Sequence, residues 1–247
     1  MEARALRVHL LAHTPDPERV VALSARLCYS ESDPSELDSR LSDSQVHTLL
    51  RKLREIGHFS PWEHALFTFS VAGISRTCLA QLTRHRIASY SVRSQRYVQE
   101  DDFSYVVPPT VERKDEAAKL FHSHVKQQRQ AYMDLIKLGI PKEDARFVLP
   151  GAATTNLILS MNARELTGSF FLLRTCTRAQ WEIRRLANKM LALARDAAPV
   201  LFETAGPACV SRGHCSEGEM SCGRYKRIQS VQAKTAATAD GQTGVET

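Results

Sequence analysis

The sequence lacks the long apolar runs that cross a membrane, because none of its apolar stretches approaches the length of a spanning helix. Its first residues, Met-Glu-Ala-Arg-Ala-Leu-Arg, contain no apolar signal-peptide core. Internal repeats are missing too, as is any linker that would separate two domains. We therefore expect a cytoplasmic protein with no membrane partner.

Two common nucleotide-binding devices are also missing. The chain has no Gly-x-Gly-x-x-Gly sequence and no Gly-Lys-Ser/Thr phosphate loop, so any nucleotide cofactor must be bound in another way. Its six cysteines do not have the spacing of a disulfide framework. Cys28, Cys78 and Cys176 lie in helical or apolar surroundings, and we expect reduced thiols.

The composition is otherwise that of a globular protein. Apolar residues make up 43% of the 247 residues, which is enough for a hydrophobic core. The net charge is +6 and the pI is near 9.1, which favours anionic ligands such as nucleotides, nucleic acids or polyanionic cofactors. The positive charge is spread along the chain, so the net charge alone does not choose between them.

Apolar periodicity predicts alternating strands and helices. Strands are expected at 5–12, 65–71 and 103–107, a loop at 31–42, and helices at 20–27, 43–56, 75–83, 113–138, 155–174 and 178–201. In the long helix, the expected inner stripe consists of Leu120, Val125, Tyr132, Leu135 and Leu138. We predict an α+β fold in which one domain, residues 1–227, packs a mostly antiparallel sheet against long helices. Residues 228–247 have the composition of a disordered tail.

A basic stretch, Gln81–Tyr97, follows an apolar run. It contains Arg84, His85, Arg86, Arg93 and Arg96 among hydroxyl and amide side chains, with almost no acid nearby. Uncompensated cations attached to a core suggest an anion pocket, with phosphate as the favoured anion, and the alternative is a solvated basic face. Consecutive side chains diverge on a helix or strand, so the Arg-His-Arg triplet can face two ligands.

Three further arginines, Arg146, Arg164 and Arg174, lie among apolar residues, where an unpaired arginine is costly to bury. Pairing with Glu165 or Glu182 is the structural alternative to a ligand role.

Two His-containing groups do not match zinc spacing, and we predict no metal. His58 and His64 are six residues apart across a proline, which favours the polar rim of a pocket. A second group favours a surface loop; its members are Cys209, His214, Cys215 and Cys222.

Several segments, in order, resemble the flavin-dependent thymidylate synthases over about residues 20 to 223. Arg84-His85-Arg86, seven residues and Ser94 reproduce that family's signature. The supporting segments are His58–His64, Ser89-Tyr90, Ser94–Tyr97, Ala145-Arg146 with Leu149-Pro150, Asn162–Leu166, and Arg174 followed by Arg178–Glu182. Six segments in register are far more specific than one short motif.

The resemblance implies methylation of dUMP to dTMP, with methylenetetrahydrofolate as carbon donor and NADPH reducing a bound FAD. It also implies a homotetramer with active sites between subunits. By motif position, the FAD contacts are Ser60, Arg84, His85, Arg86, Asn162, Arg164 and Ser169. The dUMP contacts are Gln81, Arg84, Ser94, Gln95, Arg96, Arg146 and Arg174. The catalytic candidates are Arg174, Ser94 and His58.

The resemblance places Arg174 at the uracil ring, where a guanidinium stabilises negative charge and makes C5 more nucleophilic. His58 is placed near flavin and folate. Ser94 is a nucleophile or a hydrogen-bonding partner of dUMP, and the second role is favoured because no partner that would activate it is apparent. Flavin hydride delivery also makes a protein nucleophile dispensable.

Two departures from the family pattern stand out. Val92 replaces the acid or amide that some members carry two residues before the signature serine. The segment between Leu166 and Arg174 is one residue longer than the family spacing, and it offers Gly168 or Ser169 where a His or Asn would touch flavin.

Two rival functions remain open. A nucleic-acid-binding module, suggested by the basic pI, predicts colourless protein and steeply salt-dependent binding, whereas our prediction is no nucleic-acid partner. An inactive relative that binds nucleotide without turnover is suggested by the altered segment Thr167–Ser169.

Overall fold

The computed structural model describes residues 5–230. Contacts divide the chain into two compact units, each built from two separate stretches. The first unit comprises the chain up to Thr14 and Leu66–Asn162, and the second comprises Pro15–Ala65 and the chain from Ala163 onward. The predicted boundaries of one domain, residues 1–227, stay a prediction.

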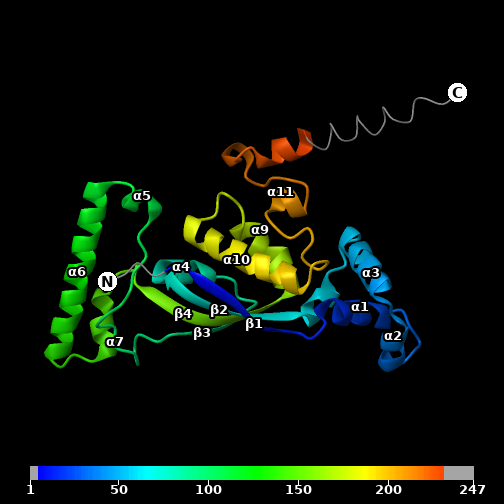
Figure 1. The fold of residues 1–247 in the computed structure, drawn as a ribbon, viewed down its shortest axis with the longest axis horizontal. Helices are drawn as coiled ribbons and strands as arrows, with labels where there is room; N and C mark the ends of the chain where they lie inside the picture. Colours follow the sequence, from blue (N-terminus) through cyan, green and yellow to red (C-terminus); the bar gives the residue numbers. More distant parts are fainter. Residues whose placement is uncertain (1–4, 231–247) are drawn as a thin grey trace. The chain divides into compact units, whose positions relative to one another are not determined.

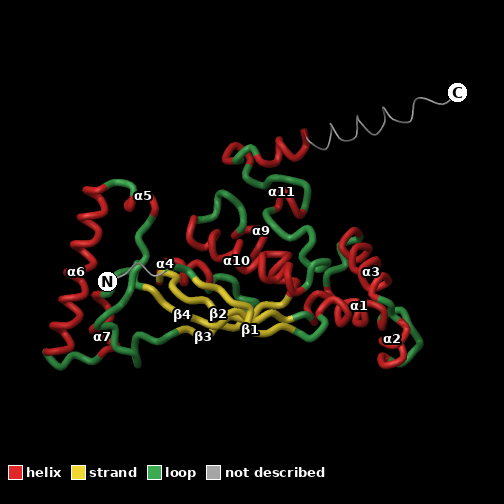
Figure 2. Tube along the Cα trace, in the orientation of Figure 1, coloured by secondary structure: helices red, strands yellow, loops and turns green. Residues whose placement is uncertain are grey.

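The first unit is organised by a four-stranded antiparallel sheet in the order β1-β2-β4-β3 (Figures 1 and 2). Its strands are β1 Arg7–His13, β2 Leu66–Ser75, β3 Ser89–Val92 and β4 Thr154–Asn162. The sheet confirms the α+β prediction with antiparallel strands.

Alternating residues of β2 and β4 give the sheet one apolar face. Phe67 and Phe69 of β2 are fully buried, as is Leu159 of β4. On the other face, the hydroxyls of Thr68 and Ser160 hydrogen-bond across the strands at 2.8 Å. The hydrophobic alternation therefore sets the register of this pair.

Helices and turns complete the first unit. They are α4 Arg76–Leu82, α5 Pro109–Glu112, α6 Asp115–Lys137, α7 Lys142–Ala145 and the 3₁₀ turn η2 Arg146–Val148. Helix α6 contributes Val125 to a small core with Phe103, Tyr105 and Ala153. The Tyr105 hydroxyl also lies 2.7 Å from His122 Nδ1 on the same helix, which fixes the loop before α5 onto α6.

The second unit is mostly helical. Its elements are α1 Pro17–Leu27, α2 Pro34–Arg40, α3 Asp43–Glu55, the 3₁₀ turn η1 Ser60–His64, α8 Ala163–Glu165, the π-helical turn η3 Leu166–Phe170, α9 Phe171–Arg174, α10 Trp181–Ala197, α11 Ala208–Ser211 and the 3₁₀ turn η4 Gly218–Met220. Glu18 of α1 anchors the segment after α10, because its Oε1 accepts from the backbone N–H groups of Val200 and Leu201 at 2.6 and 3.1 Å.

Three of the predicted elements are wrong. Residues 155–162 form strand β4 instead of helix, because Leu157, Leu159 and Met161 alternate at the two-residue period of a strand. The loop at 31–42 contains α2, which begins where Asp33 accepts from the backbone N–H of Ser35. At 103–107, only Tyr105 pairs, in an isolated bridge with Ala153.

The predicted disordered tail, residues 228–247, stays a prediction. Residues 228–230 are helical and continue a helix that begins at residue 224, where the side chains of Gln229 and Tyr225 hydrogen-bond at 2.9 Å. The rest of the predicted tail lies outside the described residues. The inner stripe of α6 is also narrower than predicted, because Leu120 and Leu138 are exposed while Val125 and Tyr132 are buried. Across the described residues, no helix is both long and apolar enough to cross a membrane.

Candidate active site

The Arg84-His85-Arg86 triplet lies in a turn between α4 and β3 of the first unit. Its conformation is fixed by Tyr90, whose hydroxyl lies 2.9 Å from the carbonyl oxygens of both Leu82 and His85. His85 is buried, whereas Arg84 and Arg86 are exposed. The middle side chain of the triplet is thus shielded from solvent and the outer two are not, while its facing two ligands stays a prediction. Neither arginine forms an ion pair with a residue in the described part of the chain.

The other arginines of the basic stretch, Arg93 and Arg96, form ion pairs with glutamates, which contradicts the expectation of uncompensated cations. Arg93 Nη2 lies 3.3 Å from Oε2 of Glu100, a carboxylate that is almost fully buried. Arg76 donates from Nη2 to the backbone carbonyl of Arg93 at 2.8 Å. Burial raises the pKa of Glu100, although Arg93 and Arg76 lower it, and burial lowers the pKa of Arg76. Glu100 lies seven residues beyond Arg93, outside the stretch considered from the sequence.

Glu143 brings together two arginines that are fifty residues apart. Its carboxylate pairs with Arg96, and its backbone carbonyl accepts from Arg146 Nε at 2.9 Å. Within the same unit, Gln95 Nε2 is buried and has no hydrogen-bond partner among the described residues. Gln95, Arg96 and Arg146 are predicted to bind one ligand. In the structure, the guanidinium groups of Arg96 and Arg146 both contact Glu143, and Gln95, the residue before Arg96, has an unsatisfied amide donor.

Ser94 shows no arrangement for nucleophilic attack. Its Oγ accepts from the backbone N–H of Arg96 at 3.1 Å, which closes the turn that presents Gln95 and Arg96. A histidine or carboxylate partner for Ser94 is not found among residues 5–230. This geometry favours a binding role for Ser94 over a nucleophilic one. Gln81 lies on α4, and Asn162 ends β4.

In the second unit, Arg164 forms an ion pair with Glu63. Both side chains are about half exposed, so a ligand can reach the guanidinium. Glu63 belongs to the same short turn as Ser60, and His58 lies two residues before that turn begins. The sequence suggested Glu165 or Glu182 as an ion-pair partner for Arg164, but the partner in the structure is Glu63.

The altered segment before Arg174 is a π-helical turn, Leu166–Phe170. Such turns contain one residue more than the equivalent α-helical turn and are frequent at functional sites. Ser169 lies in this turn, and Arg174 is the last residue of α9, one turn later. The π-helical turn accounts for the extra residue without interrupting the helix.

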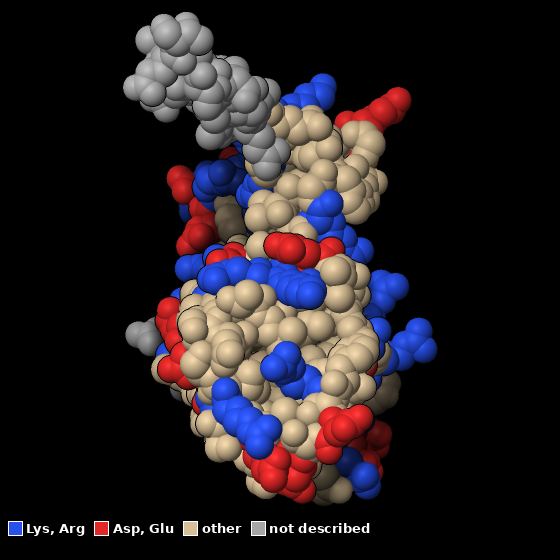
Figure 3. Space-filling model, turned by 90° about the vertical axis from the view of Figure 1, so that its right-hand side faces the viewer, with Lys and Arg blue, Asp and Glu red and all other residues tan. Residues whose placement is uncertain are grey.

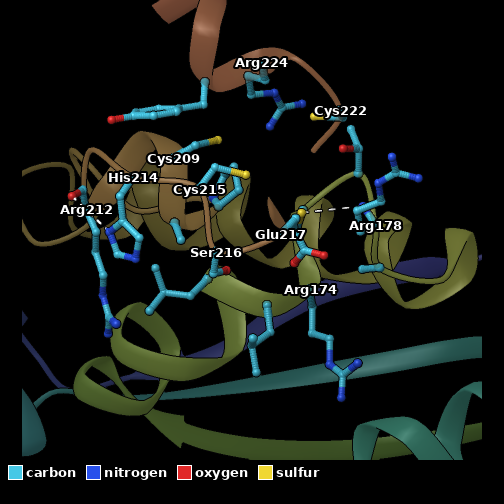
Figure 4. A pocket seen from close by; sticks show the side chains of 18 of the residues that line it. Arg174, Arg178, Cys209, Arg212, His214, Cys215, Ser216, Glu217, Cys222 and Arg224 are labelled. Carbon is cyan, nitrogen blue, oxygen red and sulfur yellow. Dashed lines mark hydrogen bonds between the residues drawn. The ribbon is translucent and has the colours of Figure 1, made fainter. Parts of the chain in front are cut away.

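A pocket of about 440 Å³ lies beside Arg174 in the second unit (Figure 4). Four cysteines line it, namely Cys176, Cys209, Cys215 and Cys222. Burial raises the pKa of Cys209, whereas a hydrogen bond with Thr177 lowers that of Cys222. The sequence suggested a surface loop for Cys209, Cys215 and Cys222. Nothing in the local sequence indicates that they share a pocket with Cys176.

Comparisons with known proteins identify the family of this chain. The sequence model of the family described as thymidylate synthase complementing protein matches residues 9–200. The chain is 50% identical over 226 residues to the flavin-dependent thymidylate synthase of Geobacter sulfurreducens, covering 91% of this chain and 97% of that protein. The protein belongs to this family.

Further relatives support the assignment. The flavin-dependent thymidylate synthase of Clostridium tetani is 43% identical over 242 residues, 92% of this chain and 96% of that protein. A crystal structure of a UMP/dUMP methylase from Streptomyces cacaoi, bound with 5-Br dUMP, superposes with a TM-score of 0.71 at 26% identity, covering 81% of this chain and 94% of that one. These matches confirm the family resemblance read from the motifs.

Proposed function

We propose that this family member is a flavin-dependent thymidylate synthase that methylates dUMP to dTMP, and that it works in the cytoplasm. The observation that carries the proposal is the convergence of Arg96 and Arg146 on Glu143, together with the buried amide of Gln95, the residue before Arg96, which has no hydrogen-bond partner among the described residues. Two guanidinium groups and an amide donor suit a nucleotide phosphate together with a base or sugar oxygen. Relatives named for this activity match along most of the chain.

In this proposal, Arg96 exchanges its Glu143 partner for the phosphate of dUMP, and Arg146 stays oriented by the Glu143 carbonyl. Gln95 gains the acceptor that it lacks. Ser94 and Gln81 add hydrogen bonds to the nucleotide. Arg174 stabilises negative charge on the uracil ring and so makes C5 a better nucleophile. The methyl carbon comes from methylenetetrahydrofolate.

The chain also has residues that fit a flavin. Arg84 and Arg86 are exposed guanidinium groups without an ion-pair partner among the described residues, which suits the diphosphate of FAD. Arg164, Asn162, Ser60 and Ser169 are proposed to complete this site, with His85 packed behind the turn and His58 near the flavin and folate. Bound FAD, reduced by NADPH, supplies the hydride.

We further propose a homotetramer with active sites between subunits. The resemblance to the flavin-dependent thymidylate synthases is the basis for proposing that a second copy contributes part of each site. Native mass measurement of the purified protein tests this assembly, and a monomer that retains full turnover contradicts it.

The test of the function is tritium release from C5-labelled dUMP, with the expected release requiring both NADPH and methylenetetrahydrofolate. The purified protein should be yellow, and a colourless protein that cannot be reconstituted with FAD contradicts the proposal. Basic and acidic side chains are interspersed on the face that Figure 3 presents. Nucleic-acid binding that weakens steeply with salt, in protein without turnover, would favour the rival.

Arg174→Ala should lower turnover by about 100- to 1,000-fold, the effect of removing one donor to a developing negative charge, while FAD stays bound. The matched control is Arg26→Ala, at an exposed arginine near the end of α1. Unchanged turnover in Arg174→Ala refutes the assigned role.

A further inference from the structure

Four of the six cysteines of this chain line one pocket, although they come from two separate stretches. Cys176 follows α9, and Cys209, Cys215 and Cys222 come from the segment 206–223 after α10. Cys215, Cys222 and Cys176 are each close enough to act electrostatically on Cys209. Figure 4 shows Cys209, Cys215 and Cys222 around the pocket, while Arg174 extends away from them.

Backbone N–H groups act on two of these sulfurs. The N–H of Arg178 donates to Cys176 Sγ at 3.5 Å, and the backbone N–H of Arg224 lowers the pKa of Cys222. In both cases, the N–H group belongs to the residue two positions after the cysteine. Gly223, between Cys222 and Arg224, has a φ of 79°, a left-handed conformation that glycine adopts without strain. Backbone N–H groups directed at sulfur stabilise thiolates that ligate metals.

The segment after Val210 lacks a hydrophobic core of its own. Among residues 210–230 no side chain is buried, and the only elements between Gly206 and Gly223 are α11 and η4, of four and three residues. Apolar side chains in this segment, Val210 and Met220, are exposed. Small segments of this kind are commonly held together by a metal or by disulfides in place of a core.

Positive charge surrounds the four sulfurs. The pocket lining includes Arg178, Arg212 and Arg224 in addition to Arg174. Four thiolates around Zn²⁺, or around an iron–sulfur core of the same formal charge, carry a net charge of about −2. The lining also contains one carboxylate, that of Glu217, so the four arginines leave a net positive charge that offsets the negative charge of such a centre.

We propose that Cys176, Cys209, Cys215 and Cys222 form a four-thiolate site for a soft metal centre, either an iron–sulfur cluster or a zinc ion. Among residues 5–230, no group of three or more His, Cys, Asp or Glu side chains already lies at single-ion spacing. Binding therefore requires the segment 206–223 to close on one ion, or the sulfurs to remain apart around a larger cluster. Cys176 lies two residues after Arg174, so the centre fixes the loop that follows this arginine.

The first test measures iron, zinc and acid-labile sulfide in the full chain, produced with both metals and purified without oxygen. Iron with an equal amount of sulfide identifies a cluster, and about one zinc per chain identifies a single ion. Metal K-edge absorption should show sulfur ligands alone, at about 2.3 Å. Metal-free protein with reactive thiols or with disulfides overturns the proposal, as does a centre with nitrogen or oxygen ligands.

The second test compares cysteine variants of the full chain. Cys215→Ser and Cys222→Ser should each lose at least about 90% of the metal, whereas Cys28→Ser, at an exposed cysteine outside the pocket, should retain it. His214→Ala, which also changes a pocket residue, should retain it too. Retention in both cysteine variants, or equal loss in His214→Ala, overturns the four-cysteine assignment. Absorption measurements on the wild type decide the case if a variant does not fold.

Coupling of this centre to Arg174 rests on the proposed function. Removal of the metal with a chelator should lower tritium release from labelled dUMP, and restoring the metal should recover it. Metal content is measured independently of turnover, so an inactive protein with a sulfur-ligated metal contradicts only the proposed function. An active protein without metal contradicts only this proposal.

Discussion

Glu100 offers a sharp test of how the basic stretch is held. Its carboxylate is almost fully buried and interacts with Arg93 at 3.3 Å, and Arg76 lies close enough to lower its pKa. Glu100→Ala removes the carboxylate that interacts with both of these guanidinium groups. Removing one partner of a buried ion pair costs about 3–5 kcal/mol, and since Arg93 is 34% exposed to water we expect the lower end, about 3 kcal/mol.

Urea unfolding followed by circular dichroism measures this cost. With a dependence of about 2–3 kcal/mol per molar urea, the midpoint of Glu100→Ala should fall by about 1–1.5 M. Glu112→Ala, at an exposed glutamate at the end of α5, is the matched control and should change the free energy of unfolding by less than about 0.5 kcal/mol. A Glu100→Ala protein as stable as the control refutes the reasoning.

The same variant has a functional readout. Arg93 and Glu100 bracket the segment that carries Ser94, Gln95 and Arg96, so loss of the ion pair should loosen the proposed dUMP site. The KM for dUMP should rise by about tenfold, equivalent to about 1.4 kcal/mol, while FAD binding stays unchanged. An unchanged KM in a destabilised protein would show that this ion pair supports the fold alone.

Three further predictions concern the same elements. Because burial raises the pKa of Glu100, its contribution to the free energy of unfolding is largest below the ordinary glutamate pKa and falls as pH rises through the folded pKa. Wild type should thus lose stability relative to Glu100→Gln as pH rises over that range in urea titrations, and a pH-independent difference contradicts the pKa direction. Tyr90→Phe removes the hydroxyl that donates to the carbonyl oxygens of Leu82 and His85. The free energy of unfolding, measured by thermal denaturation, should fall by about 1–3 kcal/mol, and FAD binding should weaken. Wild-type values for both quantities contradict the role of this hydroxyl. Ser94→Ala should keep measurable tritium release with a raised KM for dUMP, and complete loss of release would support a nucleophile.

The sequence was sufficient for the sites that are carried by contiguous motifs. The Arg-His-Arg triplet and the Ser94–Arg96 turn are both recognisable there, because the residues proposed to bind one ligand lie close together in the chain. Their partners were missed. Glu143 lies 47 positions after Arg96, and nothing in its local sequence shows that the fold returns it to that arginine.

The errors in secondary structure have a common physical cause. The consecutive apolar residues in 155–162 are only Leu157–Leu159, and so short a run fits a buried helix or a strand equally well until the burial of alternate residues is known. Strand β4 is central, paired with β2 on one side and β3 on the other, so tertiary pairing decided between the two. Asp33 and Pro34 begin α2. Both residue types also favour turns, so the sequence alone predicts a loop there.

The π-helical turn links the altered sequence to the position of Arg174. One extra residue in a regular α-helix rotates every later side chain by about 100°, so an insertion before Arg174 would direct its guanidinium to another side of the helix. A π-helical turn accommodates one more residue within a single turn and so cancels most of that rotation. Residues 166–170 adopt this turn, and α9 continues from it without a break to Arg174. The extra residue is therefore compatible with an Arg174 that faces the uracil ring, and the altered spacing does not favour an inactive relative.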